Sequence, residues 1–438
     1  MKESGKLKRE IGVFGLAAGV INFIVGAGIF ALPALVFVIV GNVSILAYLL
    51  CGLLLLMIML CFAEIGSQVT VSGGVYAYIQ EAFGPYVGFL SNILYWFAYA
   101  VLADAAIANA MADMLALQFA PLNDDIYRGI FFFAVFGLFS VVNIIGVKQG
   151  VRMVKLLTAI KLVPLVLLVI IGLFYIDTQN LSLETWPGVQ SFGEASILLF
   201  FAFGGGEGAL STSGEIKNPQ RVVLRGLALG TIGVITLYIA IQLVCQGIIG
   251  QDLINFTEAP LAEAANRIIG PIGITILVFA AAISIFSTLS GSIMHYPRIL
   301  YAGAESGIAP AFLAKIHSKY STPIWAILTY AFLDFFFSIT GGFEQLAKIS
   351  SAALLLIYLG VVLATIKLRR DRGHKPHEGF TIPGGYTIPV ISIVVILWFL
   401  YQLSMDELMR VVVFFLILSG IYLVMEYVKK ISSSQGPK

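Results

Sequence analysis

Charged residues are scarce in this sequence, since Asp, Glu, Lys and Arg together make up only 11% of its 438 residues. A soluble domain carries roughly twice that fraction to keep its surface hydrated. Hydrophobic residues make up 59%, and apolar runs recur from residue 11 almost to the C-terminal end. This composition excludes an ordinary soluble protein and predicts one that crosses a lipid bilayer many times.

Cysteine and histidine are also rare, with three and four residues. Cys51, Cys61 and Cys245 lie inside apolar runs without metal-ligand spacing, which is typical of small buried hydrophobic residues and not of disulfides. The sequence contains no Walker phosphate loop, no Ser-His-Asp arrangement and no HExxH motif. We therefore expect no metal, no cofactor, no use of ATP and no enzymatic activity. The net charge of +2 gives no reason to expect a nucleic acid as a partner.

Each apolar run is long enough, at about 20 residues, to cross roughly 30 Å of hydrocarbon. In that solvent every backbone N–H and C=O must be paired within its own segment, so the runs are expected to be helices. The fold class is therefore an all-α integral membrane protein with about twelve transmembrane helices. We expect them at residues 11–39, 43–66, 85–117, 128–147, 156–176, 193–214, 225–250, 269–301, 323–340, 348–368, 387–403 and 411–430.

The distribution of Lys and Arg predicts the orientation. If the N-terminus lies in the cytoplasm, most of the 26 basic residues fall in cytoplasmic segments, where the positive-inside rule places them. The reversed orientation would put them outside. We therefore expect an inner (plasma) membrane protein whose tails, residues 1–10 and 431–438, are both cytoplasmic.

Two of the expected helices contain glycine clusters, VGAGIF at residues 25–30 and FGGGEG at residues 203–208. Close helix packing explains a pair of glycines. It does not explain Glu207, because a carboxylate near the middle of a membrane is costly unless it faces water or a partner. Three consecutive glycines also weaken a helix. Both helices are therefore predicted to be interrupted at these points.

The two clusters lie in the first helix of each of two five-helix blocks, residues 11–176 and 193–368, and residues 387–430 add two further helices. An odd number of helices gives the second block inverted topology. Paired interrupted helices in inverted repeats indicate a central binding site. Free N–H groups at helix N-termini there attract a carboxylate, and exposed carbonyls suit an ammonium group. A zwitterionic amino acid fits both.

Several separated stretches occur in a specific order along residues 10–400. They are VGAGIFALP (25–33), AEI (63–65), SGGVYAY (72–78), EAFG (81–84), GEIKNP (214–219), RILYA (298–302), GIAP (307–310) and KYSTP (319–323). Together they resemble the amino acid–polyamine–organocation (APC) superfamily, of the amino acid permease type. The resemblance implies a five-plus-five inverted-repeat fold and alternating access around the two interruptions. Thr70 departs from the family pattern, which often has proline there.

The same resemblance implies a set of substrate contacts. The backbone around the first interruption would receive the substrate carboxylate, at Gly26, Ala27, Gly28 and Ile29. The backbone of the second would receive the amino group, at Phe203, Gly204, Gly205 and Gly206. Many members have a bulky residue at the last of these positions, so its glycine could make the pocket roomier.

Lys161 lies six residues beyond Lys155, about 9 Å deeper along its helix. It could snorkel to the cytoplasmic surface. By the family resemblance it could instead replace the sodium ion of sodium-coupled relatives, bridging to the first helix and to hydroxyls of Ser287 and Thr288. Proton coupling and exchange both remain open, because exchangers of this group can carry a lysine too.

Glu207 could brace the interruption or relay a proton. Asp104 could be a packing residue, or a counter-ion for a basic side chain such as that of lysine or a polyamine. The other conspicuous residues are expected to be structural, interfacial or part of an aromatic belt: Glu64, Asp334, Tyr95, Trp96 and Tyr99.

The sequence thus predicts a secondary active transporter of amino acids, working as a symporter or an antiporter, with protons as a possible second partner. Two alternatives stay open. One is a transporter or exporter of polyamines or other organic cations. The other is an amino acid-sensing membrane receptor or a channel.

Overall fold

A computed structural model describes residues 11–67, 75–145, 151–183, 186–305, 307, 309–372 and 380–434. The motif residues 72–74, Thr70, residue 308, the N-tail and the end of the C-tail lie outside these ranges. Within them the chain is helical, apart from loops and one isolated bridge between Ile11 and Ile216.

The helices have the following bounds. They are α1 (Val13–Ile24), α2 (Gly28–Val40), α3 (Ser44–Gly66), α4 (Val75–Phe83), α5 (Pro85–Ile93), α6 (Leu102–Ala116), α7 (Asp125–Ile145), α8 (Val151–Gly172), α9 (Val189–Phe200), α10 (Pro219–Ile249), α11 (Pro260–Ile269), α12 (Pro271–Glu305), α13 (Ile324–Thr340), α14 (Phe343–Arg372), α15 (Thr387–Tyr401) and α16 (Met405–Ser434). A π-helical segment, η2 (Leu94–Val101), joins α5 to α6.

Among the described residues, seven stretches of helix are long and apolar enough to cross a membrane. They are Gly28–Gly66, Pro85–Ala116, Asp125–Ile145, Gln220–Asn255, Pro271–Glu305, Phe343–Arg372 and Met405–Tyr427. Shorter apolar helices lie at Val13–Ile24, Ala159–Tyr175, Ile324–Thr340 and Thr387–Tyr401. The chain is therefore a multi-pass membrane protein.

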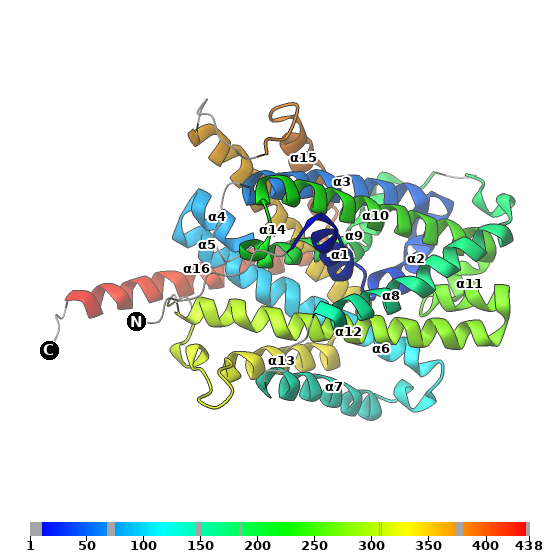
Figure 1. Cartoon of the computed structure of the whole chain (residues 1–438), viewed down its shortest axis with the longest axis horizontal. Coiled ribbons are helices and arrows are strands. Elements are labelled where there is room, and N and C mark those ends of the chain that lie inside the picture. The colour runs from blue at the N-terminus through cyan, green and yellow to red at the C-terminus, as the bar shows by residue number, and fades with distance from the viewer. Residues whose placement is uncertain are drawn as a thin grey trace.

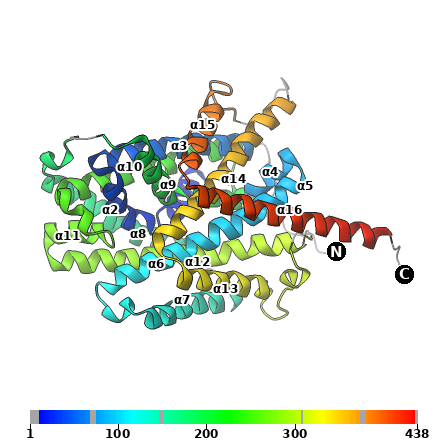
Figure 2. The ribbon, with the colours of Figure 1, turned by 180° about the vertical axis from the view of Figure 1, so that it is seen from behind.

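Most of the long helices run along the horizontal axis of Figure 1, including α3, α10, α12 and α7. The short helix α11 lies at one end of this bundle, while α4 and the C-terminal end of α16 lie toward the other (Figures 1 and 2). The helices α1 and α9 lie near the middle of the bundle. This arrangement surrounds the glycine-rich segments with other helices.

Both predicted interruptions are present. The first expected helix consists of α1 and α2, separated by residues 25–27. The expected helix at 193–214 consists of α9, the 3-10 turn η6 (Phe201–Phe203) and the 3-10 segment η7 (Gly206–Glu215). The start of α1 meets the end of η7, where the Lys217 N–H donates to the Ile11 carbonyl over 2.9 Å. The other halves, α2 and α9, pack against each other.

Candidate functional site

The first interruption exposes backbone donors. The helix α1 ends at Ile24, and Val25 is extended with φ −71° and ψ 97°. The next helix, α2, begins at Gly28 with no side-chain cap. Within the described part of the chain, the amides of residues 26–29 have no hydrogen-bond acceptor. The unpaired N–H groups at the start of α2 carry the positive end of its dipole, which attracts anions.

The second interruption exposes backbone acceptors. Gly204 is extended, with φ −71° and ψ 159°, and Gly205 has φ +100°, a conformation that favours glycine. A Cβ on Gly205 would also lie 2.9 Å from the carbonyl oxygen of Phe23. The carbonyls of Phe203 and Gly204 have no donor among the described residues, and that of Gly205 accepts only the Gly208 N–H. These oxygens suit an ammonium group.

The two interruptions are in close contact. A Cβ added to Gly28 would lie 2.7 Å from Cα and 2.8 Å from Cβ of Ala202. Only glycine therefore allows the start of α2 to approach η6 so closely. Because of this approach, residues of both interruptions border a common space.

That space is a cavity of about 60 Å³. Six of the predicted site residues line it: Gly26, Ala27, Gly28, Gly204, Gly205 and Asp104. Thr288, which was predicted only as a partner of Lys161, also lines it. Besides Tyr99, the cavity is lined by residues that no sequence pattern indicates: Phe23, Ile24, Ala100, Ala103, Ile107, Phe201, Ala202, Ser292 and Tyr296.

Three residues predicted at the pocket do not line it. Ile29 is fully buried beside it. Phe203 points its ring toward Tyr238, with centroids 5.2 Å apart. A Cβ on Gly206 would meet Cδ1 of Ile24 at 2.9 Å. The expectation of a roomier pocket at Gly206 is therefore wrong, because the Ile24 side chain fills that space.

Tyr99 was expected to be a packing or belt residue, but it lines the cavity. It lies in the π-helical segment η2, five residues before Asp104. Such segments change the face on which the following side chains lie and are frequent at functional sites. A sequence pattern based on regular α-helical spacing gives no signal for this change.

Lys161, on α8, is fully buried, so its ammonium group does not snorkel to the surface. Its Nζ donates to the carbonyl oxygens of Asn22 and Val25, each over 3.1 Å, and to Oγ1 of Thr288 over 3.0 Å. The predicted bridge to the first helix and to a hydroxyl is present. Of the two hydroxyls proposed for it, Thr288 makes the contact and Ser287 does not.

Glu207 is buried and lies next to the second interruption. One oxygen accepts the hydroxyl of Tyr95 over 3.2 Å, and the other accepts the hydroxyl of Tyr358. Glu207 therefore connects the η7 segment to η2 and α14. It does not line the cavity, and both oxygens already have partners, which is the geometry of a brace.

Asp104, on α6, is 2% exposed and accepts the hydroxyl of Tyr330 over 3.0 Å. It is the one carboxylate among the described residues that lines the cavity. No group of three or more His, Cys, Asp or Glu side chains in the described ranges is placed to hold a metal ion.

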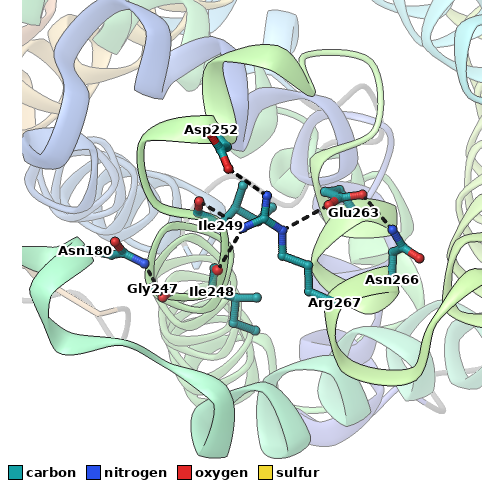
Figure 3. Close-up of polar contacts among 8 residues, drawn as sticks. All are labelled: Asn180, Gly247, Ile248, Ile249, Asp252, Glu263, Asn266 and Arg267. Carbon is teal, nitrogen blue, oxygen red and sulfur yellow. Dashed lines mark hydrogen bonds and ion pairs between the residues drawn. The ribbon is translucent and has the colours of Figure 1, made fainter.

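The end of the bundle at α11 carries a charged cluster around Arg267 (Figure 3). The guanidinium donates to Glu263 over 3.0 Å, to Asp252 over 3.1 Å and to the Ile249 carbonyl over 3.3 Å. Partial burial lowers its pKa, but the hydrogen bonds that it donates to Glu263 and Asp252 outweigh this effect and raise the pKa above the usual value for arginine. The cluster ties α11 to the C-terminal end of α10.

At the other end of the bundle, Glu64 was expected to be interfacial, but it is only 3% exposed. It forms a two-pronged ion pair with Arg369 at the end of α14, with Nε and Oε1 2.9 Å apart. The Ile382 N–H also donates to Glu64 over 2.9 Å. This ion pair ties α3 to α14 and to the loop before α15.

A helical membrane protein with a small cavity between two interrupted helices has the architecture of a transporter. The chain matches the amino acid permease family over residues 11–426, which is nearly its whole length, and it belongs to that family. It is thus an amino acid transporter.

Several characterised proteins are similar along most of their length. The serine/threonine exchanger SteT of Bacillus subtilis is 29% identical over 399 residues, covering 89% of this chain and 90% of the relative. The methylthioribose transporter of Bacillus subtilis is 26% identical over 427 residues, covering 92% and 90%. The branched-chain amino acid permease BcaP of Bacillus subtilis is 24% identical over 437 residues, covering 95% and 92%.

Proposed function

We propose that this permease is a sodium-independent, secondary active transporter of small neutral amino acids. The observation that carries the proposal is the cavity of about 60 Å³, which has free amides on one side and free carbonyls on the other. A zwitterion satisfies both sets of groups at once. The small volume favours short side chains, such as those of alanine, serine and threonine.

In the proposed complex, the substrate carboxylate accepts the N–H groups of Gly26, Ala27 and Gly28, and the ammonium group donates to the carbonyls of Gly204 and Gly205. The side chain then faces Asp104 and Ser292. Similarity to a serine/threonine exchanger supports a small polar substrate.

Sodium independence is proposed from Lys161. Its ammonium group already occupies the space between Val25 and Thr288, with three hydrogen bonds. A second cation there would be repelled and would lack free ligands. Transport would therefore be driven by protons or by exchange against an internal amino acid.

We further propose twelve membrane-crossing segments in a five-plus-five inverted repeat, with residues 11–176 and 193–368 as the repeats and 387–430 as two added helices. Alternating access would take place around the two interruptions. The pairing of α1 with η7, and of α2 with α9, supports inversion, because each N-terminal half contacts the C-terminal half of the other interrupted helix. The distribution of basic residues supports cytoplasmic termini in the inner (plasma) membrane.

A second substrate class is favoured by one observation, which is that Asp104 lines the cavity. A carboxylate there could pair with a basic side chain or a polyamine. The substrate panel below therefore includes lysine, arginine and putrescine.

The test is uptake into liposomes that contain the purified full-length protein, with protein-free liposomes as the control. Labelled glycine, alanine, serine, threonine, leucine, lysine, arginine and putrescine are offered, with and without sodium, an inward proton gradient or unlabelled internal substrate. Saturable, sodium-independent uptake of alanine, serine or threonine is expected. Stimulation by the proton gradient identifies symport, and stimulation by preloading identifies exchange. Uptake of putrescine or arginine alone would refute the proposal, and flux that neither saturates nor shows counter-transport would indicate a channel.

A further inference from the structure

Asp334 is a second buried carboxyl group, on the helix whose Tyr330 contacts Asp104. It lies on α13, its side chain is fully buried, and neither of its oxygens has a hydrogen-bond partner in the described part of the chain. The sequence suggested a structural role, but a structural aspartate normally accepts hydrogen bonds. Its lack of partners therefore requires another explanation.

The contacts between α6 and α13 show where Asp334 faces. One turn before it, the Tyr330 hydroxyl donates to Asp104 of α6 over 3.0 Å. One turn after it, the Ser338 carbonyl accepts Nδ2 of Asn109 of α6 over 3.0 Å. Residues four apart lie on the same face of a helix. Asp334 therefore faces α6 between its two contacts, close to the carboxyl group that lines the cavity.

No basic residue compensates this pair. Among the described residues, neither Asp104 nor Asp334 takes part in an ion pair. Arg128 of α7, which contacts α6, is already bound to Asp113 and Asn109.

Other ionisable groups around the pair are few. The hydroxyls of Tyr99 and Tyr296 face the same region from η2 and α12, and Tyr296 stacks on Tyr330 with ring centroids 5.9 Å apart. Lys161 and Glu207 lie near the two interruptions and have their own partners.

An isolated carboxylate in an apolar interior is unfavourable, and two adjacent carboxylates are still more so, whereas a protonated carboxyl group avoids both penalties. The unpartnered oxygens of Asp334 are thus consistent with a neutral acid. We propose that Asp104 and Asp334, on the facing helices α6 and α13, form a proton-binding pair, and that a neutral amino acid in the cavity binds together with a proton on this pair.

The coupling follows from the position of Asp104. A substrate with a neutral side chain displaces water from the cavity and leaves Asp104 without solvation, which favours its protonated form. Proton and substrate then bind cooperatively, and the cooperativity is reciprocal. This inference rests on the proposed transport of neutral amino acids and adds the location of the proton.

Two measurements test the pair on the purified full-length protein in lipid nanodiscs. The first is equilibrium binding of labelled L-alanine as a function of pH. If one proton is linked to binding, the Kd increases about tenfold per pH unit above the point where the pair loses its proton. The second is infrared spectroscopy of the protonated carboxyl stretch without substrate, in which Asp334→Asn should remove a band.

The following variants distinguish a specific effect of the two carboxyl groups from a general loss of structure. Asp104→Asn and Asp334→Asn are expected to flatten the dependence of alanine affinity on pH, and Tyr330→Phe should alter it while keeping the packing of the ring. Asp113→Asn is the matched control, because it removes a carboxylate from the same helix outside the pair, and it should retain the wild-type slope.

The proposal is overturned if Asp334→Asn keeps both the pH slope and the infrared band. It is also overturned if Asp113→Asn flattens the slope as strongly as Asp104→Asn. Absence of alanine binding at every pH would instead contradict the proposed substrate class. The infrared band can still be measured in that case, so the two failures are distinguishable.

Discussion

Gly28→Ala tests whether the close approach of the two interruptions creates the substrate site. The added Cβ would lie 2.7 Å from Cα and 2.8 Å from Cβ of Ala202. Carbon atoms in contact normally lie about 3.5–4.0 Å apart. The start of α2 and the η6 turn would therefore have to separate by roughly 1 Å, because Cα of Ala202 cannot rotate away.

The magnitude follows from this displacement. Overpacking of this kind costs about 1–3 kcal/mol. It moves the amides of residues 26–29 away from the carbonyls of residues 203–205, so one substrate cannot reach both sets of groups. If this whole free-energy cost destabilises the conformation that binds substrate, the affinity for L-alanine should fall by roughly 5- to 150-fold.

The assay is equilibrium binding of labelled L-alanine to purified protein, together with a thermal melt to show that the variant is folded. Gly291→Ala is the matched control, because a Cβ there has no atom within 4 Å. It should bind alanine normally and gain roughly 0.5–1 kcal/mol of stability as a helical glycine replaced by alanine. Gly26→Ala should be intermediate, since its Cβ would lie 3.6 Å from Oγ1 of Thr288, an ordinary contact.

A folded Gly28→Ala protein with alanine affinity within twofold of wild type would refute this reasoning. In that case the approach of Gly28 to Ala202 would serve packing alone.

Four further substitutions are predicted from the contacts around the cavity and at the two ends of the bundle. Lys161→Met leaves the carbonyls of Asn22 and Val25 without a donor, at about 1–3 kcal/mol each, so we expect transport to fall more than tenfold in the liposome assay. Glu207→Gln keeps the size of the brace but weakens its bonds to two tyrosines, so the transport rate should fall about tenfold, with alanine affinity within about threefold of wild type. Glu64→Gln leaves a partly buried arginine without its carboxylate and should destabilise the protein by about 3–5 kcal/mol in denaturant titrations. Arg267→Ala should cost only about 1 kcal/mol, because Asp252 is largely exposed. Since the pKa of Arg267 is raised, that contribution should persist as the pH rises from neutral and be lost only above the usual arginine pKa. If Glu64→Gln and Arg267→Ala destabilised the protein equally, the argument that the more buried ion pair contributes more would be wrong.

The two interruptions were predictable from the sequence because their cause is local. Three consecutive glycines and a carboxylate disfavour a straight membrane helix whatever surrounds them. The contact of Lys161 with the first helix was also anticipated by the family resemblance. In both cases the type of residue constrains the structure more strongly than the surrounding segments do.

Other features depend on packing between distant segments. Ser287 and Thr288 are adjacent in sequence, but a rotation of about 100° per residue separates their directions, and only the latter reaches Lys161. The space beside Gly206 is filled by Ile24, which lies far away along the chain. No local pattern specifies either outcome.

The surroundings of Asp334 also depend on packing between distant segments, and here the packing bears on the proposed function. The sequence predicts a structural role, because the helix of Asp334 is expected to lie farther from the site than the interrupted helices do. The expected position of a helix does not show which neighbour each of its side chains faces. The contacts of Tyr330 and Ser338 place it against α6, one turn from the residue that bonds to Asp104.

The charge on Asp104 should also decide which substrates this transporter accepts. It is the one carboxylate among the described residues lining the cavity, so a neutral side chain favours its protonated form and a basic side chain favours its ionised form. Raising the pH should therefore lower the ratio of alanine uptake to lysine uptake, in competition assays at several pH values. Asp104→Asn should fix this ratio at its low-pH value. A ratio that still changes with pH in that variant would show that another group sets the selectivity.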